Sequence, residues 1–404
     1  MKKATRILAL VLCAVMCLGL FVGCGNKDKQ NNDTPLVVGY SPFNSKFSPF
    51  FSETAYDQDV WVMTAISLLN GDRQGAIIMK GIEGETKAYN GTDYTYYGPA
   101  DCEIVENTDG TVDYNFKLRE DLKFSDGEPI TIDDVIFSMY VLCDPTYDGN
   151  STLFALPIEG MDAYRSGMDT LYNLMLAAGR DNTDFTNNKW TEEEQTAFWA
   201  DVDQAGVKFV QDIMQYCIAE GANAEGDSVA ACMKNWGYDL PADATEADAF
   251  NAIVAKYPSL AEAVDAEKPE GTTFTSLLND YETKYTKGIE TGTSAANISG
   301  IKKTGDYSMT VSLTQVDATA IYQLGVTIAP MHYYGEKTKY NYENNQFGFD
   351  KGDLSTVRAK TTTPLGAGPY KFIKFENGTV NFEANDSYYL GAPKTKYVNF
   401  LQTQ

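Results

Sequence analysis

The chain lacks most of the side chains from which common catalytic centres are built. It contains a single histidine, His332, in 404 residues. One histidine excludes H-E-x-x-H zinc sites and histidine clusters, and it leaves only this residue as the base of a Ser-His-Asp arrangement. No G-x-S-x-G sequence and no G-x-x-x-x-G-K-[ST] phosphate loop occurs either. Carboxylate pairs are abundant in so acidic a chain, but none stands out, and we therefore expect a protein that is not an enzyme.

Basic residues are also scarce. Lys and Arg number 32 against 56 Asp and Glu, which gives a net charge of −24 at pH 7. Phosphate backbones would repel such a chain, and no cluster of Lys or Arg offsets the repulsion, so we expect no nucleic-acid partner. The 43% of hydrophobic residues suffice for a substantial core, and the length allows two or three domains.

The seven cysteines form no C-x-x-C pair and have no metal-ligand spacing. Four of them follow the N-terminal region, namely Cys102, Cys143, Cys217 and Cys232. Cys217 and Cys232 flank a helical reversal and are candidates for a disulfide outside the cytoplasm. Buried free thiols are the favoured interpretation for all four, because cysteine is often a small core residue. The Asp- and Asn-rich runs miss the calcium-loop spacing, and we expect no metal and no cofactor.

Residues 1–23 are typical of a signal peptide. Lys2, Lys3 and Arg6 precede an apolar run over residues 7–22, which is short for a membrane span. The sequence Phe21-Val22-Gly23-Cys24 resembles a lipobox, in which the cysteine takes a diacylglyceryl group. Cys24 is therefore the predicted lipidation site, with an uncleaved anchor as the alternative. Residues 24–35 are polar and turn-prone, as a flexible tether between lipid and domain would be.

Residues 36–164 predict mixed α/β structure without a regular βαβ rhythm. Expected elements are a buried strand at Leu36–Tyr40, a capped helix from about residue 57 to 69, and short strands at 76–82, 86–89 and 94–97. A strand around Glu103–Val105 should pair with residues 112–118 through the turn Asn107-Thr108-Asp109-Gly110.

The segment FKLREDLKFSDGEPITIDDVIFS, residues 116–138, predicts a strand, a turn and a helix. Apolar residues alternate with polar ones over residues 112–118, as in a half-buried strand. Asp126-Gly127 makes the turn, and Thr131 with Asp134 forms a capping box at the start of the helix. Asp144-Pro145 should end this helix.

Between residues 165 and 297 the pattern becomes helical. Leu171, Leu174, Met175 and Ala178 form one apolar stripe. Capping boxes at Thr191–Glu194 and Thr245–Asp248 open two more helices, and Phe274, Leu277, Leu278 and Tyr281 predict a fourth. No catalytic constellation occurs in this interval, which we interpret as a helical lid or flank. Strand-like alternation returns at Met309, Val311 and Leu313.

Several motifs, in this order, resemble family 5 of the bacterial extracellular solute-binding proteins, the oligopeptide- and dipeptide-binding lipoproteins of ABC importers. The first is the 116–138 segment, with its F-x-L-R, F-x-D-G-x-P and D-V-x-F-S positions. The others are ISGIKKTGDYSMTVSL, IAPMHYYG, PLGAGPYKF and VNFEANDSYYLGAPKTKYVNF. His332, in the IAPMHYYG motif, matches a position common in the family, and a structural role is expected for it.

The resemblance implies an α/β fold of the type II periplasmic-binding-protein class, whose two lobes close over a ligand. Residues 36–51 and 298–404 are expected to build the sheet of lobe I, and residues 52–164 an appended α/β subdomain. Residues 165–297 would be a helical insertion, because family members usually cross this interval in far fewer residues. Lobe II would lie beyond Gln404, so we expect a chain truncated at its C-terminus.

The resemblance also implies a function. The protein would be a monomeric lipoprotein, held on the outer face of the cell membrane by the lipid on Cys24. It would capture a peptide ligand and deliver it to the permease of its ABC importer. The alternatives left open are another solute, such as a metal chelate or a sugar, a role in peptide sensing, and a secreted surface hydrolase.

Ligand contacts are predicted in two places. In the peptide binders the acidic residue that pairs with the ligand's α-amino group belongs to lobe II, so the resemblance places no such residue here. The remaining candidates are the aromatic and polar loop after the first strand and one glycine turn: Asn44, Ser45, Phe47, Ser48, Phe50, Gly366, Ala367 and Gly368. Packing against the sheet is an equal alternative for the loop, and a tight backbone path beside Tyr370 is one for the glycines.

Overall fold

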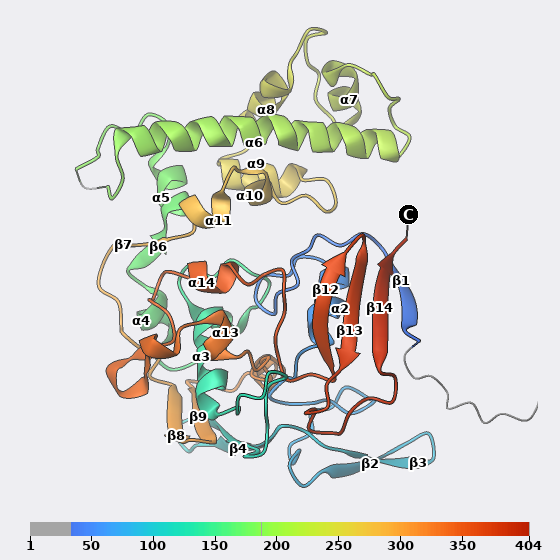
Figure 1. The fold of residues 1–404 in the computed structure, drawn as a ribbon. Helices are drawn as coiled ribbons and strands as arrows, with labels where there is room; N and C mark the ends of the chain where they lie inside the picture. Colours follow the sequence, from blue (N-terminus) through green and yellow to red (C-terminus); the bar gives the residue numbers. More distant parts are fainter. Residues whose placement is uncertain (1–33, 187, 404) are drawn as a thin grey trace, which may run out of the picture.

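The computed structural model of the protein describes residues 34–186 and 188–403. An α/β body with two main sheets carries a separate layer of helices on one side (Figure 1). The predicted signal peptide and the lipidation site Cys24 lie outside the described residues. Among the described helices, none has the length and apolar character needed to cross a membrane.

The first sheet has the strand order β1-β14-β13-β12. Its strands are β1 (Leu36–Tyr40), β12 (Tyr370–Glu376), β13 (Thr379–Ala384) and β14 (Tyr397–Gln402). Strand β1 runs parallel to β14, whereas the other pairs are antiparallel. Alternate residues of β13 and β14 point to one face, where they pack with Phe43, Phe47 and Val60 from the loop after β1 and from helix α2 (Ala55–Val62).

The second sheet has the order β4-β5-β9-β8 and is antiparallel throughout. Its strands are β4 (Ala100–Glu106), β5 (Val112–Leu118), β8 (Ile301–Gly305) and β9 (Ser308–Leu313). The pairing of β4 with β5 confirms the predicted hairpin. The expectation that residues 298–313 join the sheet of β1 is wrong. The apolar alternation of β9 matches that of β5, with Tyr114 opposite Val311 and Phe116 opposite Met309, so pairing these strands buries both sets in one core.

Helix α3 (Ile132–Cys143) packs in this larger core, and every residue of it except Asp133 is buried. The capping box of Thr131 and Asp134 is present as predicted. Asp134 also accepts a hydrogen bond from the backbone N–H of Met331 at 3.1 Å, and Ser138 accepts one from Ala329 at 2.9 Å. The helix of the 116–138 segment thus holds the IAPMHYYG motif in place.

The helical segment, residues 171–284, has its own apolar core. It comprises α5 (Leu171–Ala178), α6 (Glu192–Ala219), α7 (Val229–Asn235), α8 (Glu246–Ala255), α9 (Leu260–Glu267), α10 (Phe274–Leu277) and α11 (Tyr281–Lys284). The capping boxes at Thr191 and Thr245 are confirmed. The single helix predicted through Tyr281 is wrong, because Leu278 is extended and Asp280 is left-handed at φ 52°.

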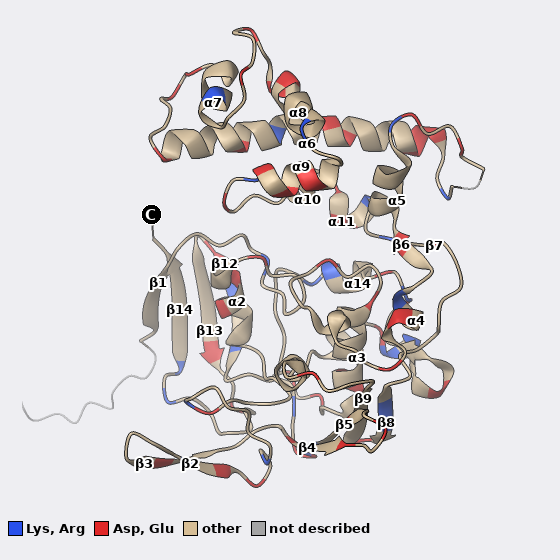
Figure 2. Ribbon diagram, turned by 180° about the vertical axis from the view of Figure 1, so that it is seen from behind, with Lys and Arg blue, Asp and Glu red and all other residues tan. Residues whose placement is uncertain are grey.

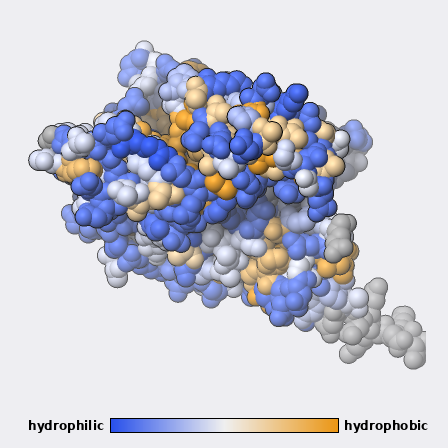
Figure 3. All heavy atoms as spheres, turned by 90° about the horizontal axis from the view of Figure 1, so that it is seen from above, coloured by the Kyte–Doolittle hydropathy of each residue, from blue (hydrophilic) through white to orange (hydrophobic). Residues whose placement is uncertain are grey.

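Two short strands connect the helical segment to the body. Strand β6 (Met168–Thr170) enters it, β7 (Gly288–Glu290) leaves it, and the two pair antiparallel. Acidic residues are spread along both the helical segment and the body (Figure 2). Viewed from above, the helical segment shows a mostly hydrophilic surface with apolar residues between the polar ones (Figure 3).

Two local predictions in the body are wrong. Helix α2 ends at Val62 instead of continuing to residue 69, because Ile66 and Leu68 form backbone hydrogen bonds with the 326–328 segment. Residues 76–82 form isolated bridges instead of a strand. The two strands predicted after residues 76–82 are present, and they pair as a hairpin of β2 (Glu85–Tyr89) and β3 (Thr92–Tyr96).

The remaining elements of the body are short. They are α4 (Met161–Arg165), α12 (Ala320–Gln323), α13 (Met331–Tyr334), α14 (Ser355–Arg358), the strands β10 (Tyr340–Asn341) and β11 (Gln346–Phe347), and the 3-10 turns η1 (Leu153–Ala155), η2 (Lys337–Lys339) and η3 (Tyr342–Asn344).

Candidate functional site

A cavity of about 470 Å³ lies where the helical segment meets the body, and we call it the junction cavity. Its volume falls within the range of about 300–1,000 Å³ that small-ligand sites occupy. The body supplies Lys46 and residues 51–53 from the loop after β1, residues 148–150 after α3, and Arg358 at the end of α14. The helical segment supplies the opposite wall from residues 273–283, around α10 and α11.

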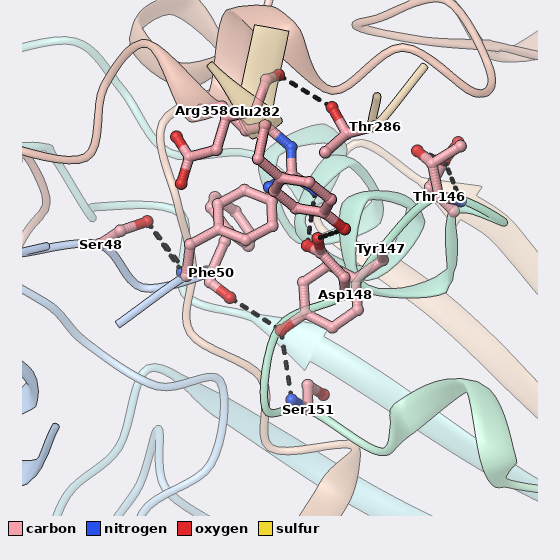
Figure 4. Close-up of polar contacts among 12 residues, drawn as sticks. Ser48, Phe50, Thr146, Tyr147, Asp148, Ser151, Glu282, Thr286 and Arg358 are labelled. Atoms are coloured by element: carbon pink, nitrogen blue, oxygen red, sulfur yellow. Dashed lines mark hydrogen bonds and ion pairs between the residues drawn. The ribbon is translucent and has the colours of Figure 1, made fainter. Parts of the chain in front are cut away.

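Arg358 is the most deeply placed charge in this cavity. Its side chain is 6% exposed, and its Nη2 donates to Oδ1 of Asp148 at 2.6 Å (Figure 4). The guanidinium carbon lies 4.3 Å from the centre of the Phe51 ring, which covers one face of the cation. The Nε atom is buried and has no hydrogen-bond partner among the described residues. A buried cation with an unused donor is costly, so this atom requires an explanation.

The loop after β1 is held in place beneath the cavity. Tyr147 donates from its hydroxyl to the carbonyl oxygen of Phe50 at 2.8 Å, and the same hydroxyl accepts from the N–H of Ser151 at 3.2 Å (Figure 4). Ser48 accepts through Oγ from the N–H groups of Phe50 and Phe51, each at 3.2 Å. Burial raises the pKa of Tyr147 to about 12, so its hydroxyl keeps its proton at neutral pH.

The start of the same loop is fixed by Asp57 in the first turn of α2. The Asp57 carboxylate is fully buried, and it accepts from the backbone N–H groups of Asn44 at 3.1 Å and of Lys46 at 3.0 Å. Burial raises the pKa of this carboxyl group, and the backbone donors oppose that rise. Sequence reasoning missed this residue, because an aspartate near a helix start is ordinarily a solvated cap.

Two polar contacts cross the junction from α11. Lys46 Nζ lies 2.7 Å from Oε1 of Glu53 in its own loop and 3.0 Å from Oε1 of Glu282 in α11. Tyr281 donates to Oδ2 of Asp148 at 3.2 Å. Burial alone would lower the pKa of Lys46, but the two glutamates outweigh it and raise the pKa. The contacts between α11 and the body at this cavity are therefore polar, and each of them is individually weak.

The predicted residues of the loop lie beside the cavity rather than in its wall. Asn44 is exposed and Ser45 is partly buried, whereas Phe47, Ser48 and Phe50 are buried. The cavity is lined instead by their neighbours, Lys46 and residues 51–53. The buried side chains have the packing role that was the alternative interpretation. Ligand contact by the loop stays a prediction.

The predicted glycine turn lies against the end of α2. Gly366, Ala367 and Gly368 are all buried, and none of them lines the junction cavity. The carbonyl of Gly366 accepts from Ser125 at 2.9 Å, and a Cβ on Gly366 would lie 2.3 Å from the carbonyl oxygen of Thr64. The two glycines thus allow a close backbone approach, and a ligand contact at this turn stays a prediction.

Three polar side chains of the cavity wall were not predicted from the sequence. Arg358, Asp148 and Tyr281 come from three distant parts of the chain, and only the fold brings them together. One feature of the sequence could have drawn attention to Arg358: it is the only arginine after Arg180 in a chain poor in basic residues.

His332, the only histidine, lies elsewhere, with Nε2 2.7 Å from Oδ2 of Asp126 in the turn of the 116–138 segment. The four cysteines of the described chain are buried and free, and burial raises the pKa of each thiol. Within the described residues no group of three or more His, Cys, Asp or Glu side chains is placed to hold a metal ion.

The chain matches the model of a known protein family. The model of the middle region of the bacterial extracellular solute-binding proteins, family 5, matches residues 98–166 and 261–404, more than half of the chain. Among curated proteins, the oligopeptide-binding protein AppA of Bacillus subtilis (strain 168) is 27% identical over 114 residues. That alignment covers 28% of this chain and 19% of AppA.

Solved structures with a similar fold include two complexes. Lactococcal OppA with an endogenous peptide in the closed conformation has a TM-score of 0.42 and 14% identity, and the match covers 91% of this chain and 41% of OppA. NikZ from Campylobacter jejuni with Ni(L-His) has a TM-score of 0.38 and 13% identity, with 91% and 39% covered. The chain spans about a fifth of the length of its curated relative and about two fifths of the length of these solved chains.

Proposed function

Because this chain belongs to family 5 of the bacterial extracellular solute-binding proteins, we propose that it captures a peptide outside the cytoplasm for an ABC importer. The family match over residues 98–166 and 261–404 is the observation that carries this proposal. The one curated relative described above, an oligopeptide-binding protein, supports a peptide as the solute.

The proposed binding site is the junction cavity. It lies between two bodies with separate apolar cores, and its walls come from both. The helical segment is attached through the β6–β7 pair, and side-chain contacts cross at Lys46–Glu282 and Tyr281–Asp148. In this proposal the helical segment is a lid that turns about β6 and β7 and closes over the solute. Asn44 and Ser45, at the base of the loop, remain candidate contacts for a solute that extends beyond the cavity.

The proposal includes the cellular setting. A lipid on Cys24 would hold the protein on the outer face of the cell membrane, and the polar residues that follow would act as a tether. The partner would be the permease of the importer, to which a monomer delivers its solute. Radiolabelled palmitate incorporated by the wild-type protein, and not by a Cys24→Ser variant, is the expected result.

Thermal unfolding of the full chain tests the solute class. A ligand that binds the folded state at 100 times its Kd stabilises that state by about 2.7 kcal/mol, so a matching peptide pool should raise Tm by several degrees. Pools of di-, tri- and longer peptides are compared with single amino acids, sugars and metal chelates. A rise with peptides supports the proposal, and no rise with any peptide pool contradicts it.

The alternatives predict different results. A rise only with a sugar or a chelate would assign the scaffold to another solute. Peptide binding by a protein whose gene has no permease or ATPase genes beside it would favour sensing. Turnover of a substrate, lost when one carboxylate is replaced, would favour a surface hydrolase.

A further inference from the structure

We propose that the junction cavity selects a solute with a cationic side chain, and that Lys46 occupies the subsite for that group in the free protein. This inference rests on the proposed function, and it names the class of peptide that the proposed site prefers, one with a lysine or arginine residue. The position of Lys46 between carboxylates of the two walls is the observation that carries it.

The subsite consists of two carboxylates on opposite sides of the cavity. Glu53 comes from the loop after β1 and Glu282 from α11, and both line the cavity. The Nζ atom of Lys46 lies 2.7 Å from Oε1 of Glu53 and 3.0 Å from Oε1 of Glu282. Both distances are those of hydrogen bonds between an ammonium group and a carboxylate. The chain's own side chain thus shows that an ammonium group fits between the two walls.

This subsite carries more negative charge than Lys46 balances, because two carboxylates share one ammonium group. Both acids are within reach of a solute, since 37% of the Glu53 side chain and 35% of the Glu282 side chain is exposed. A second cation is therefore attracted here, and an anionic group is repelled.

The rest of the wall adds to this acidic character. Four acidic and two basic residues line the cavity, which leaves an excess of two negative charges. Arg358 does not offset the excess, because it is buried and paired with Asp148. The fourth acid, Asp280, has its nearest cation, Lys284, at 3.5 Å and outside the wall. A cationic solute is thus the one that the whole wall favours.

The backbone that carries Lys46 is held in an unusual conformation. The preceding residue, Ser45, has φ 64°, in the left-handed region, whereas every other non-glycine residue with positive φ in the described chain is Asn or Asp. The buried Asp57 carboxylate stabilises this turn by accepting from the N–H groups of Asn44 and Lys46. Such strain persists only where the surrounding structure enforces it, and it is frequent at ligand sites. The fold therefore fixes where the side chain of Lys46 begins.

Lys46 acts in this proposal as a specificity-determining residue. In the free protein its ammonium group links the loop after β1 to α11. The ammonium or guanidinium group of an entering solute takes over contacts to Glu53 and Glu282, so the solute itself then links the two walls. An uncharged solute leaves Lys46 in place and gains no such contact.

The test compares peptide pools that differ in the charge of one side chain. Pools with a central lysine, norleucine or glutamate, and uncharged residues elsewhere, are titrated into the full chain by calorimetry. Their length is the one that raises Tm most in the thermal assay, and their termini are identical, so recognition of the terminal groups cancels. Because the acids are partly exposed and Lys46 competes, the wild-type chain should bind the lysine pool about threefold more tightly than the norleucine pool. The glutamate pool should bind most weakly.

Two variants locate the preference. Lys46→Met keeps both carboxylates and removes the competing ammonium group, so the lysine-to-norleucine affinity ratio should rise to about tenfold. Glu282→Gln leaves Lys46 with one carboxylate that it balances fully, so the ratio should fall to about one.

Lys337 offers a matched control. Its Nζ also lies beside a glutamate, 2.8 Å from Oε2 of Glu128, but neither residue lines the junction cavity. Lys337→Met should leave the affinity ratio at its wild-type value.

Equal binding of the lysine and norleucine pools by the wild-type chain would overturn this inference and leave the proposed function standing. An unchanged ratio in folded Lys46→Met would overturn it as well, because the cation would then bind elsewhere. If no pool binds, both proposals are overturned. Should Lys46→Met fail to fold, the wild-type comparison together with Glu282→Gln decides.

Discussion

The backbone N–H of Gly368 donates to the carbonyl oxygen of Thr64 at 2.8 Å, and this contact fixes the start of β12 against the end of α2. The two backbones are so close that a Cβ on Gly368 would lie 2.4 Å from the backbone nitrogen of Ala65. Real Cβ atoms are not found at that distance from backbone. The glycine is therefore required by packing, independently of any ligand.

Replacing Gly368 by alanine should destabilise the body. Overpacking of a close contact costs typically about 1–3 kcal/mol, and here the clash is with backbone, which cannot rotate away. Gly292→Ala is the control, because its Cβ would meet only Gly167 at 3.6 Å, an ordinary contact. Urea unfolding followed by circular dichroism should show a lower midpoint for Gly368→Ala alone. Equal midpoints for the two variants would contradict the packing argument.

Removing the N-cap of the long helix α6 should loosen its first turn. The Thr191 hydroxyl accepts from the N–H of Glu194 at 3.2 Å, and the Glu194 carboxylate accepts from the N–H of Thr191 at 2.7 Å. Loss of such a cap costs about 1 kcal/mol, so Thr191→Ala should speed hydrogen exchange at the start of α6 about fivefold.

Thr196, one turn further along α6, is the matched control for the cap. It is exposed, and its hydroxyl donates to the carbonyl of Glu192 inside the helix. Alanine has the higher helix propensity, so Thr196→Ala should slow exchange slightly or leave it unchanged. Faster exchange in both variants would mean that the cap is not the cause.

Glu267 should make the helical segment sensitive to acid. Its carboxylate is buried and accepts from the Trp236 indole at 2.8 Å, the Tyr238 hydroxyl at 2.7 Å, Lys256 at 3.1 Å, and the hydroxyl of Tyr257. Burial alone would raise the pKa of Glu267, but these donors outweigh it and hold the pKa below its usual value. A lowered pKa in the folded state contributes stability above the unfolded value of about 4.3, and this stability is lost as the pH falls through the folded pKa.

Thermal melts of the wild type and of Glu267→Gln between pH 7 and pH 3 test this linkage. The variant should melt at a lower temperature at pH 7, because hydrogen bonds to a charged acceptor are worth about 1.5–3 kcal/mol each. The difference should shrink as the pH falls below about 4.3, because the unfolded chain takes up the proton there and the folded carboxylate follows at its lower pKa. Glu270→Gln, at an exposed position nearby, should behave as the wild type. A difference that is constant with pH would contradict the linkage.

Tyr281→Phe should loosen the contact between the helical segment and the body without unfolding either. The variant loses the hydrogen bond to Asp148 across the junction, worth about 1 kcal/mol, so hydrogen exchange of α11 should accelerate about fivefold. Tyr285→Phe is the control, because its hydroxyl donates to Asp201 inside the helical segment at 2.6 Å. That variant should leave exchange in the loop after β1 unchanged. Unaltered protection of the junction in Tyr281→Phe would show that this contact does not hold the helical segment against the body.

Local chemistry could be predicted wherever neighbours in sequence decide it. The capping boxes at Thr131, Thr191 and Thr245 depend on residues three apart, and all three are present. The β4–β5 hairpin follows from one turn and one alternating pattern. The prediction of a single fourth helix was wrong because Leu278 and Asp280 leave the helical conformation, although the apolar residues there have helical spacing.

Pairings between distant segments could not be predicted in the same way. Residues 301–313 have the alternation of a strand, but that pattern does not say which sheet they join, and β9 pairs with β5. The loop after β1 lies beside the junction cavity, but Phe47 and Phe50 turn inward, and Lys46 with residues 51–53 lines the cavity.

The sequence by itself determined the family motifs, the charge and most of the helices, because these depend on composition and on short-range spacing. Only the tertiary structure decided which residues line the junction cavity. The partners of Arg358 are Phe51, Asp148 and, through Asp148, Tyr281, and these residues are separated by tens to hundreds of positions. Burial of a cation and the saturation of its partner are properties of the packed chain, and no sequence spacing records them.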